Sequence, residues 1–245
     1  LNAIAIGNQA GYDTQNTNSI AIGSSAGRDN QDIDAIAIGH SAGNTGQLNG
    51  SIAIGAQAGE ITQEAQCIAI GENAGRYQQG GEAAIALGAE AGYTGQKGFT
   101  IAIGNQAGYD TQKARSIAIG SGAGKIDQSS DAVAIGSDAG SDNQGLTSIA
   151  IGAGAGKIDQ SSDAVAIGSD AGSDNQGLTS IAIGAGAGYI NQHNNSIIIN
   201  ASGNDLNSTG SDGLFIKPIR SFPHGLGVGV LHYDPTTGEI TYSTN

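Results

Sequence analysis

Two short motifs of the chain have the residue types and spacing of a hydrolase nucleophile. Gly-x-Ser-x-Gly occurs at residues 23–27 and 39–43. In an α/β-hydrolase this motif would place Ser25 or Ser41 on a sharp turn between a strand and a helix. Equivalent segments of the chain carry Gln, Glu or Asp in the serine position, and no strand–turn–helix pattern surrounds it. We therefore expect neither serine to be catalytic.

Other candidates for binding chemistry are equally incomplete. Residues 120–125 read Gly-Ser-Gly-Ala-Gly-Lys, but Ile126 stands where a phosphate-binding loop needs Ser or Thr. The four histidines share no spacing typical of a metal site. Asp127, Asp131 and Asp138 cluster as expected of a solvated acidic face, with weak cation binding as the alternative. We predict no catalytic residues, no metal site, no cofactor and no enzymatic activity.

One variable position could make weak contacts with a partner. It follows a recurrent Ala-Gly pair and is occupied by tyrosine in several places along the chain. Tyrosine rings on a polar rod could stack on sugars, and scattered exposed side chains are the alternative. The candidate surface-contact residues are Tyr12, Tyr93, Tyr109 and Tyr189.

Apart from His224 and His232, these residues belong to a 16-residue repeat that covers most of the chain. Each copy contains Ile-Ala-Ile-Gly-x-x-Ala-Gly or a close variant, and one copy has an extra residue after Gln79. The alternation of large and small side chains predicts a strand with isoleucines on one face and alanines on the other. The two glycines argue against a helix, where each costs about 1 kcal/mol relative to Ala, and fit corners with positive φ. Which face lines the chain's own core stays open.

A glutamine stands eight positions after the first glycine of every complete copy. Coils of a solenoid stack about 4.8 Å apart, so identical amides can hydrogen-bond as a ladder along the axis. We predict a structural ladder, with a ligand-binding row of glutamines as the alternative. Its members are Gln15, Gln31, Gln47, Gln63, Gln79, Gln96, Gln112, Gln128, Gln144, Gln160, Gln176 and Gln192.

The repeat predicts an all-β fold, a parallel β-solenoid (β-roll) of 16-residue coils over residues 1–203. The period is lost over residues 204–245. There, residues 228–233 and 239–243 predict a β-hairpin around the turn Asp-Pro-Thr-Thr-Gly. A solenoid needs an atypical end to protect its last edge, so we assign residues 204–245 as a C-terminal cap.

The apolar content of one coil is small for a single chain. Burying two isoleucines contributes roughly 4–5 kcal/mol, whereas ordering 16 backbones costs on the order of 16–30 kcal/mol. Apolar side chains on both strand faces predict an oligomer in which one face meets neighbouring chains. Cys67 stands in a column of Ser, Ala and Thr, so it reads as a small filler.

The charge and hydropathy of the chain bear on its partners. A net charge of −13 disfavours nucleic acid and anionic membrane surfaces. No apolar run approaches the roughly 18–20 residues that cross a bilayer, so we expect no membrane insertion. The chain begins at Leu1 inside a repeat, and we expect it to be a fragment or a processed product.

Several phrases of the sequence resemble known fibrous proteins. Ser-Ile-Ala-Ile-Gly-x-x-Ala-Gly, as at residues 19–27 and 116–124, resembles the head repeats of trimeric autotransporter adhesins, which are left-handed parallel β-rolls with a usually shorter period. Ala-Gly-Tyr-Thr-Gly-Gln at residues 91–96 looks closer to fibre proteins of large DNA viruses and phages. Residues 196–243 resemble the capping region of such fibres, which precedes a self-cleaving intramolecular chaperone.

The resemblance implies a homotrimeric fibre segment on a virion surface or outside a cell. Such a rod would attach to a host glycan or protein receptor through rigid presentation and many weak contacts. The alternatives are a bacterial adhesin head, a glycan-degrading β-helix, and an ice-binding solenoid, although the threonine column typical of the last is missing. Residues 122–156 recur unchanged as residues 154–188, which lengthens a rod and argues against a localised active site.

Overall fold

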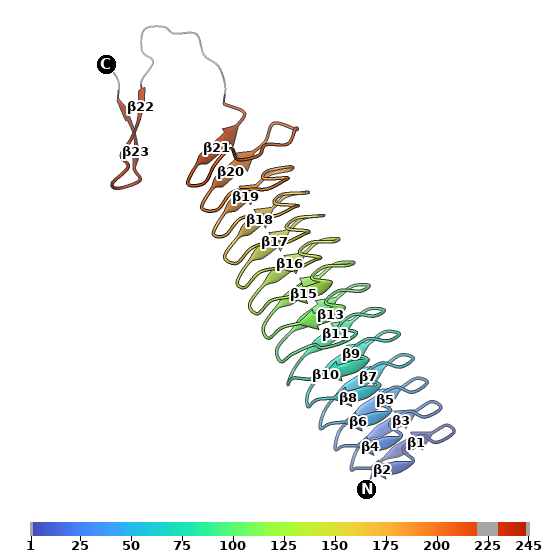
Figure 1. Ribbon diagram of the computed structural model, residues 1–245. Coiled ribbons are helices and arrows are strands. Elements are labelled where there is room, and N and C mark those ends of the chain that lie inside the picture. Colours follow the sequence, from blue (N-terminus) through green and yellow to red (C-terminus); the bar gives the residue numbers. More distant parts are fainter. Residues whose placement is uncertain (1, 220–229, 244–245) are drawn as a thin grey trace.

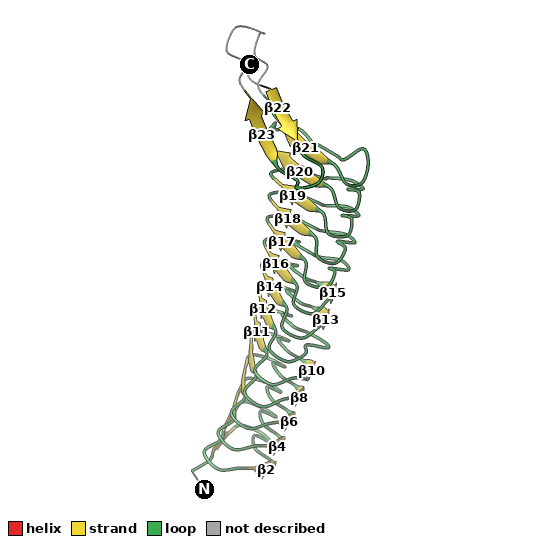
Figure 2. Ribbon diagram, turned by 90° about the vertical axis from the view of Figure 1, so that its left-hand side faces the viewer, coloured by secondary structure: helices red, strands yellow, loops and turns green. Residues whose placement is uncertain are grey.

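The chain forms a rod of stacked coils, with β1 at one end and β21 at the other (Figure 1). The structure, a computed structural model, describes residues 2–219 and 230–243, and it shows no helix among them. Each coil contributes one strand to a sheet of 14 parallel strands that follows the rod (Figure 2). Its strands, in spatial order, are β1 (Ile4–Ile6), β3 (Ile20–Ile22), β5 (Ile36–Ile38), β7 (Ile52–Ile54), β9 (Ile68–Ile70), β11 (Ile85–Leu87), β12 (Ile101–Ile103), β14 (Ile117–Ile119), β16 (Val133–Ile135), β17 (Ile149–Ile151), β18 (Val165–Ile167), β19 (Ile181–Ile183), β20 (Ile197–Asn200) and β21 (Leu214–Lys217).

A second row of strands lines the other side of the coils and ends at the glutamines. It is regular at the N-terminal end and continues mostly as single bridges, the first of them between Tyr77 and Thr94. Its strands are β2 (Asp13–Gln15), β4 (Asp29–Gln31), β6 (Thr45–Gln47), β8 (Ile61–Gln63) and β10 (Tyr77–Gln79), followed by a separate pair, β13 (Asp110–Gln112) and β15 (Ile126–Gln128).

The predicted parallel β-solenoid with 16-residue coils is confirmed by the strand register. Each strand of the first sheet pairs residue by residue with the strand one coil away, as Ala102 does with Ala118. The coil with the extra residue keeps this register, because Ile85 still pairs with Ile68 and Ile101. The additional residue is therefore taken up in the turn between Gln79 and Ile85.

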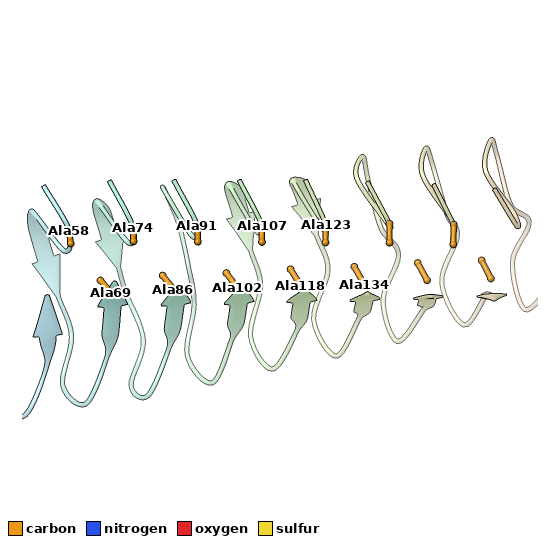
Figure 3. Close-up of a cluster of buried hydrophobic side chains, with 14 of the residues drawn as sticks. Ala58, Ala69, Ala74, Ala86, Ala91, Ala102, Ala107, Ala118, Ala123 and Ala134 are labelled. Carbon is orange, nitrogen blue, oxygen red and sulfur yellow. The ribbon is translucent and has the colours of Figure 1, made fainter. Parts of the chain in front are cut away.

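The orientation of the strand faces, which the sequence left open, is settled by burial. The central alanine of each strand from β3 to β19 is fully buried, and the isoleucines that flank it point outward and stay partly exposed. A second alanine of each coil faces it across the interior, as Ala107 faces Ala102 (Figure 3). The chain's own core is therefore a narrow double column of alanines closed by buried glutamines.

The glycine that follows each first-sheet strand from β1 to β19 cannot be replaced without displacing the next coil. Gly104 has φ +127°, and a Cβ there would lie 2.6 Å from the carbonyl oxygen of Gly120. The second glycine of the coil has another role, because a Cβ on Gly108 would lie 2.7 Å from Gln112 Oε1. One glycine column thus allows the coils to stack closely, and the other leaves room for the glutamine.

At the C-terminal end the narrow core is closed by larger side chains. Ile198 replaces the strand alanine and is fully buried, and Leu206 and Phe215 pack against this core. The first sheet therefore extends past residue 203, where the repeat ends, because β21 pairs in parallel with β20.

The predicted C-terminal hairpin is present. β22 (Val230–Tyr233) pairs antiparallel with β23 (Ile240–Ser243), and residues 228–229 of the expected first strand lie outside the described residues. The hairpin forms a sheet of its own, whereas β21 is the last strand of the 14-stranded sheet.

Candidate interaction surfaces

The outer face of the first sheet is a continuous apolar surface along the rod. Each of its 14 strands presents two outward aliphatic side chains, which are Ile, Val or Leu throughout. They shield one another in two columns, yet Ile135, Ile151 and Ile183 still expose 37–39% of their surface. A monomeric soluble protein rarely exposes one contiguous apolar patch of this extent.

The same face carries no charge over most of its length. No Asp, Glu, Lys or Arg occurs in the first-sheet strands from β1 to β20, and the first charged residue of the sheet is Lys217 in β21. The chain as a whole has 22 acidic and 9 basic residues, so the charges are concentrated on the other surfaces of the coils. Depletion of charge is a property of the buried centre of protein interfaces.

The glutamine column lies inside the rod. Gln112, in the middle of the column, is fully buried, and its Nε2 donates to the carbonyl oxygen of Ile101 at 2.9 Å and to Gln128 Oε1 at 3.1 Å. Its own Oε1 accepts from Gln96 Nε2 at 3.2 Å. Such links run from coil to coil between Gln15 and Gln176. The column is therefore a structural element, because its amides are used within the chain.

The ladder ends where the core changes. Gln192 Nε2 still donates to the carbonyl oxygens of Ile181 and Ser196, at 2.9 and 3.2 Å. Its Oε1 is buried and has no hydrogen-bond partner within the described part of the chain. One coil later the strand brings in Ile198 in place of alanine, so the amide column gives way to the apolar closure.

The tyrosines proposed as contact residues fall into one pair and two single positions. Tyr93 and Tyr109 stack with ring centroids 4.9 Å apart and an interplanar angle of 2°. Tyr12 is 71% exposed near the N-terminal end, and Tyr189 lies five coils beyond Tyr109. The structure therefore brings together only two of the four.

Sequence reasoning missed the other members of this aromatic cluster. Tyr77 meets Tyr93 edge-on at 5.3 Å, and the guanidinium of Arg76 lies 4.8 Å from the centre of the Tyr77 ring. Arg76 Nε also pairs with Glu60 Oε2 at 2.6 Å. Partial desolvation raises the pKa of Tyr77 and Tyr109. Tyr77 stands one position after the tyrosine column, so only the stacking of coils reveals that these side chains meet.

This cluster spans the place where the second sheet is interrupted. Regular strand pairing ends at β10 and resumes only at β13, and the coil with the extra residue lies in between. Tyr109 covers one face of the Tyr93 ring, so that face is not available for stacking on a ligand. The cluster joins four successive coils, and we interpret it first as a brace across the irregular part of the rod.

Carboxylates on the outer surface alternate with neutral residues from coil to coil. In the second row of strands Asp142 lies between Ile126 and Ile158, and Ile158 is bridged to Asp174. Two carboxylates in neighbouring coils would repel by about 1 kcal/mol even in water, and by more near the protein surface. The alternation therefore avoids stacked like charges.

The same rule holds at other positions of the coil, with one exception. Asp159 accepts a hydrogen bond from Asn143 at 2.9 Å, and the hydrogen bonds and charge of Arg115 hold the pKa of Asp131 below its usual value. Asp13 and Asp29 are the exception, because they pair directly in neighbouring strands. Arg28 lies 3.5 Å from Asp29 and offsets part of their repulsion.

The remaining motif residues occupy ordinary positions of the coil. Ser25 and Ser41 lie in turns with φ of 57° and 54°, in the same column as Gln9. His193 Nδ1 lies 2.9 Å from Ser208 Oγ, and His224 is outside the described residues. Across residues 2–219 and 230–243, no three His, Cys, Asp or Glu side chains come together as a metal site would require.

Comparison with known proteins identifies no relative. No family model, no curated protein and no solved structure matches the chain. Within the described residues no helix is long and apolar enough to span a bilayer.

Proposed function

We propose that the chain is a segment of a self-associating fibre, a left-handed homotrimeric β-solenoid that presents a rigid rod for attachment to a host surface on a virion or outside a cell. The observation that carries the proposal is the uncharged outer face of the first sheet, with two aliphatic side chains per strand over 14 strands. The number three, the handedness and the location rest on the resemblance to adhesin heads and viral fibres.

The energetics of this face support association. Taking about a third of each outward side chain as still exposed, as at Ile135, Ile151 and Ile183, further burial contributes roughly 0.8 kcal/mol for each aliphatic residue. Over the whole face the gross gain is on the order of 20 kcal/mol per chain, or about 800 Å² of apolar area. That area equals what each partner contributes to a stable interface of standard size.

The thin interior of a single chain supports the same conclusion. Alanine columns bury little apolar area, so the larger isoleucine side chains would stabilise the rod mainly between chains. A net charge of −13 per chain opposes assembly, but the carboxylates lie away from the first sheet. The associated rod therefore has an apolar centre and an acidic exterior.

The role in attachment follows from the length and repetition of that exterior. In an assembly of identical chains, equivalent coils display the same variable residues at the same position along the axis. Weak contacts are therefore repeated along and around the rod. Identical segments at residues 122–156 and 154–188 double one set of such contacts. Avidity then arises without a single strong binding site.

The first test is the mass in solution by light scattering coupled to size exclusion. A trimer would have a mass near three times 24.1 kDa, about 72 kDa. A dimer would refute the trimer while keeping the apolar interface, and a stable monomer near 24.1 kDa would refute association altogether.

A matched pair of variants tests which surface associates. Ile151→Lys adds charge to the first sheet, and Ile158→Lys adds the same charge to the second row of strands, at positions exposed by 37% and 39%. We expect only Ile151→Lys to lower the mass. Equal masses for both variants would contradict the proposed interface.

The attachment role is tested separately on immobilised glycans and on cell surfaces. The assembled rod should bind at least one such surface, and the dissociated Ile151→Lys chain should lose most of that binding because multivalency is lost. An assembled rod that binds none of them would restrict the function to a structural one.

A further inference from the structure

The C-terminal hairpin has one apolar face that its own chain leaves open. Leu231 and Tyr233 lie on the same face of β22, and Tyr233 pairs with Ile240 of β23. These three side chains are exposed by 71%, 66% and 55%. A two-stranded hairpin is marginally stable in water by itself, so this face requires a partner.

The apolar face of the hairpin borders a space shared with the end of the rod. A cavity of about 510 Å³ is lined by Leu231, Tyr233 and Ile240 on one side and by Ile197 and Leu214 on the other. Figure 1 shows the hairpin beside β20 and β21, with its strands separate from theirs. The cavity is about three times the roughly 150 Å³ that holds a benzene molecule in an apolar protein cavity.

The opposite wall of this cavity belongs to the outer face of the first sheet. Ile197 pairs with Leu214 in register, and both continue the outward column that begins at Ile4. The cavity therefore opens on the same surface through which we propose that the chains associate. Apart from Asn195, Asp212 and His232, its lining is aliphatic, aromatic or glycine, so an occupant continuous with that interface would bring mainly apolar side chains.

We propose that a second copy of the chain fills this space, so that the hairpin of each copy clasps the C-terminal end of its neighbour's first sheet. This inference rests on the proposed self-association. Each copy supplies one hairpin and receives one, so a closed ring of copies covers every hairpin and every sheet end at once. The hairpin is then an interchain clasp in addition to the closure that Ile198 and Phe215 give to the core.

Disulfide trapping tests the clasp directly. In a Cys67→Ala background, which places alanine where Ala35 and Ala84 stand in other coils, Leu214→Cys and Leu231→Cys are made as separate chains and assembled together. We expect mild oxidation to give a covalent pair of the two different chains, at twice 24.1 kDa on a denaturing gel. A Leu231→Cys chain assembled with Ile151→Cys, several coils away, should give none.

The outcomes separate this inference from the proposed function. A cross-link that forms only within a chain carrying both Leu214→Cys and Leu231→Cys would show that the hairpin closes on its own sheet, and would overturn the clasp. An assembled wild type whose mixed cysteine chains give no covalent pair would also overturn it, without affecting the apolar interface. A monomeric wild type would overturn both.

A second measurement does not depend on cysteine chemistry. Leu231→Ser combined with Ile240→Ser removes the apolar face of the hairpin, and we expect the dissociation constant of the assembly to rise by about tenfold or more. Thr241→Ala, on the opposite face, is the matched control and should change it less than about twofold. An unchanged dissociation constant for the double variant would contradict the clasp.

Discussion

Replacing Gly104 with alanine tests the stacking of coils most sharply. Gly104 has φ +127°, and the added Cβ would lie 2.6 Å from the carbonyl oxygen of Gly120 in the next coil. An L-residue forced into such a backbone conformation costs about 1–3 kcal/mol, and overpacking adds about 1–3 kcal/mol. We therefore expect Gly104→Ala to destabilise the fold by about 2–6 kcal/mol.

Two other glycines provide matched controls. Gly50 has φ +63° with no atom within 4 Å of the added Cβ, so Gly50→Ala has only the backbone strain of about 1–2 kcal/mol. That strain is partly offset by the reduced entropy of the unfolded chain. Gly210 has open space around it and no positive φ, so Gly210→Ala should be close to neutral.

Thermal unfolding followed by far-ultraviolet circular dichroism separates the three variants. In a chain of this size 1 kcal/mol corresponds to about 2–4 °C in Tm. Gly104→Ala should lower Tm by at least about 5 °C, Gly50→Ala by less than about 4 °C and Gly210→Ala by about 1 °C or less. If Gly104→Ala melted at the same temperature as Gly50→Ala, the claim that the Gly104 column is needed for close stacking of the coils would be refuted.

Three further predictions concern side chains. Gln112→Glu places a carboxyl group against the buried carbonyl oxygen of Ile101, so the pKa of the new glutamate in the folded chain is raised above its unfolded value of about 4.3. The free energy of unfolding should therefore fall as the pH rises above about 4.3. Urea titrations at pH 4 and pH 8 check this, and Gln112→Leu is the control without pH dependence. Burial raises the pKa of the Cys67 thiol to about 11, so a thiol reagent at pH 8 should label it only after unfolding, and rapid labelling of the native rod would contradict its burial. Tyr93→Ala removes two ring contacts worth about 1–3 kcal/mol and should lower Tm by several degrees, whereas Tyr12→Ala should leave it unchanged; equal effects would refute the brace.

The sequence predicts the architecture well because every copy of the repeat carries the same structural signals. Every strand of the first sheet up to β20 lies at a predicted position, since each copy carries the same strand and glycine signals. The hairpin at β22 and β23 is also predicted, because Pro and Gly mark its turn. The period itself therefore determines the solenoid.

The sequence did not show which strand face points into the coil, because alternation of large and small apolar residues makes both faces apolar. Ile-Ala-Ile gives two apolar faces, and only the width of the coil decides that alanine points inward. A signal was present, because Leu87 and Val133 replace isoleucine in the outward columns, whereas the alanine is unchanged from β1 to β19. A column that accepts residues of different shape faces a less restrictive environment than one that accepts only a methyl group.

The aromatic cluster could be predicted only in part. Tyr93 and Tyr109 share a column, so their proximity follows from the repeat, and Tyr77 and Arg76 required the stacking geometry. The contact of Arg76 with Glu60 links coils through side chains that no motif marks. Surface clusters of this kind depend on which variable residues fall at the same height, and that is visible only in three dimensions.

The alternation of carboxylates restricts how such a rod can change its length. Duplicating one coil of the alternating region would set two aspartates of the same column side by side, as would deleting one. Gain or loss of two coils preserves the pattern, and the identical segments at residues 122–156 and 154–188 are offset by 32 residues, which is two coils. Length in this region should therefore vary preferentially in steps of about 9.6 Å, because a one-coil change would stack aspartates as Asp13 and Asp29 are stacked, at a cost of about 1 kcal/mol or more.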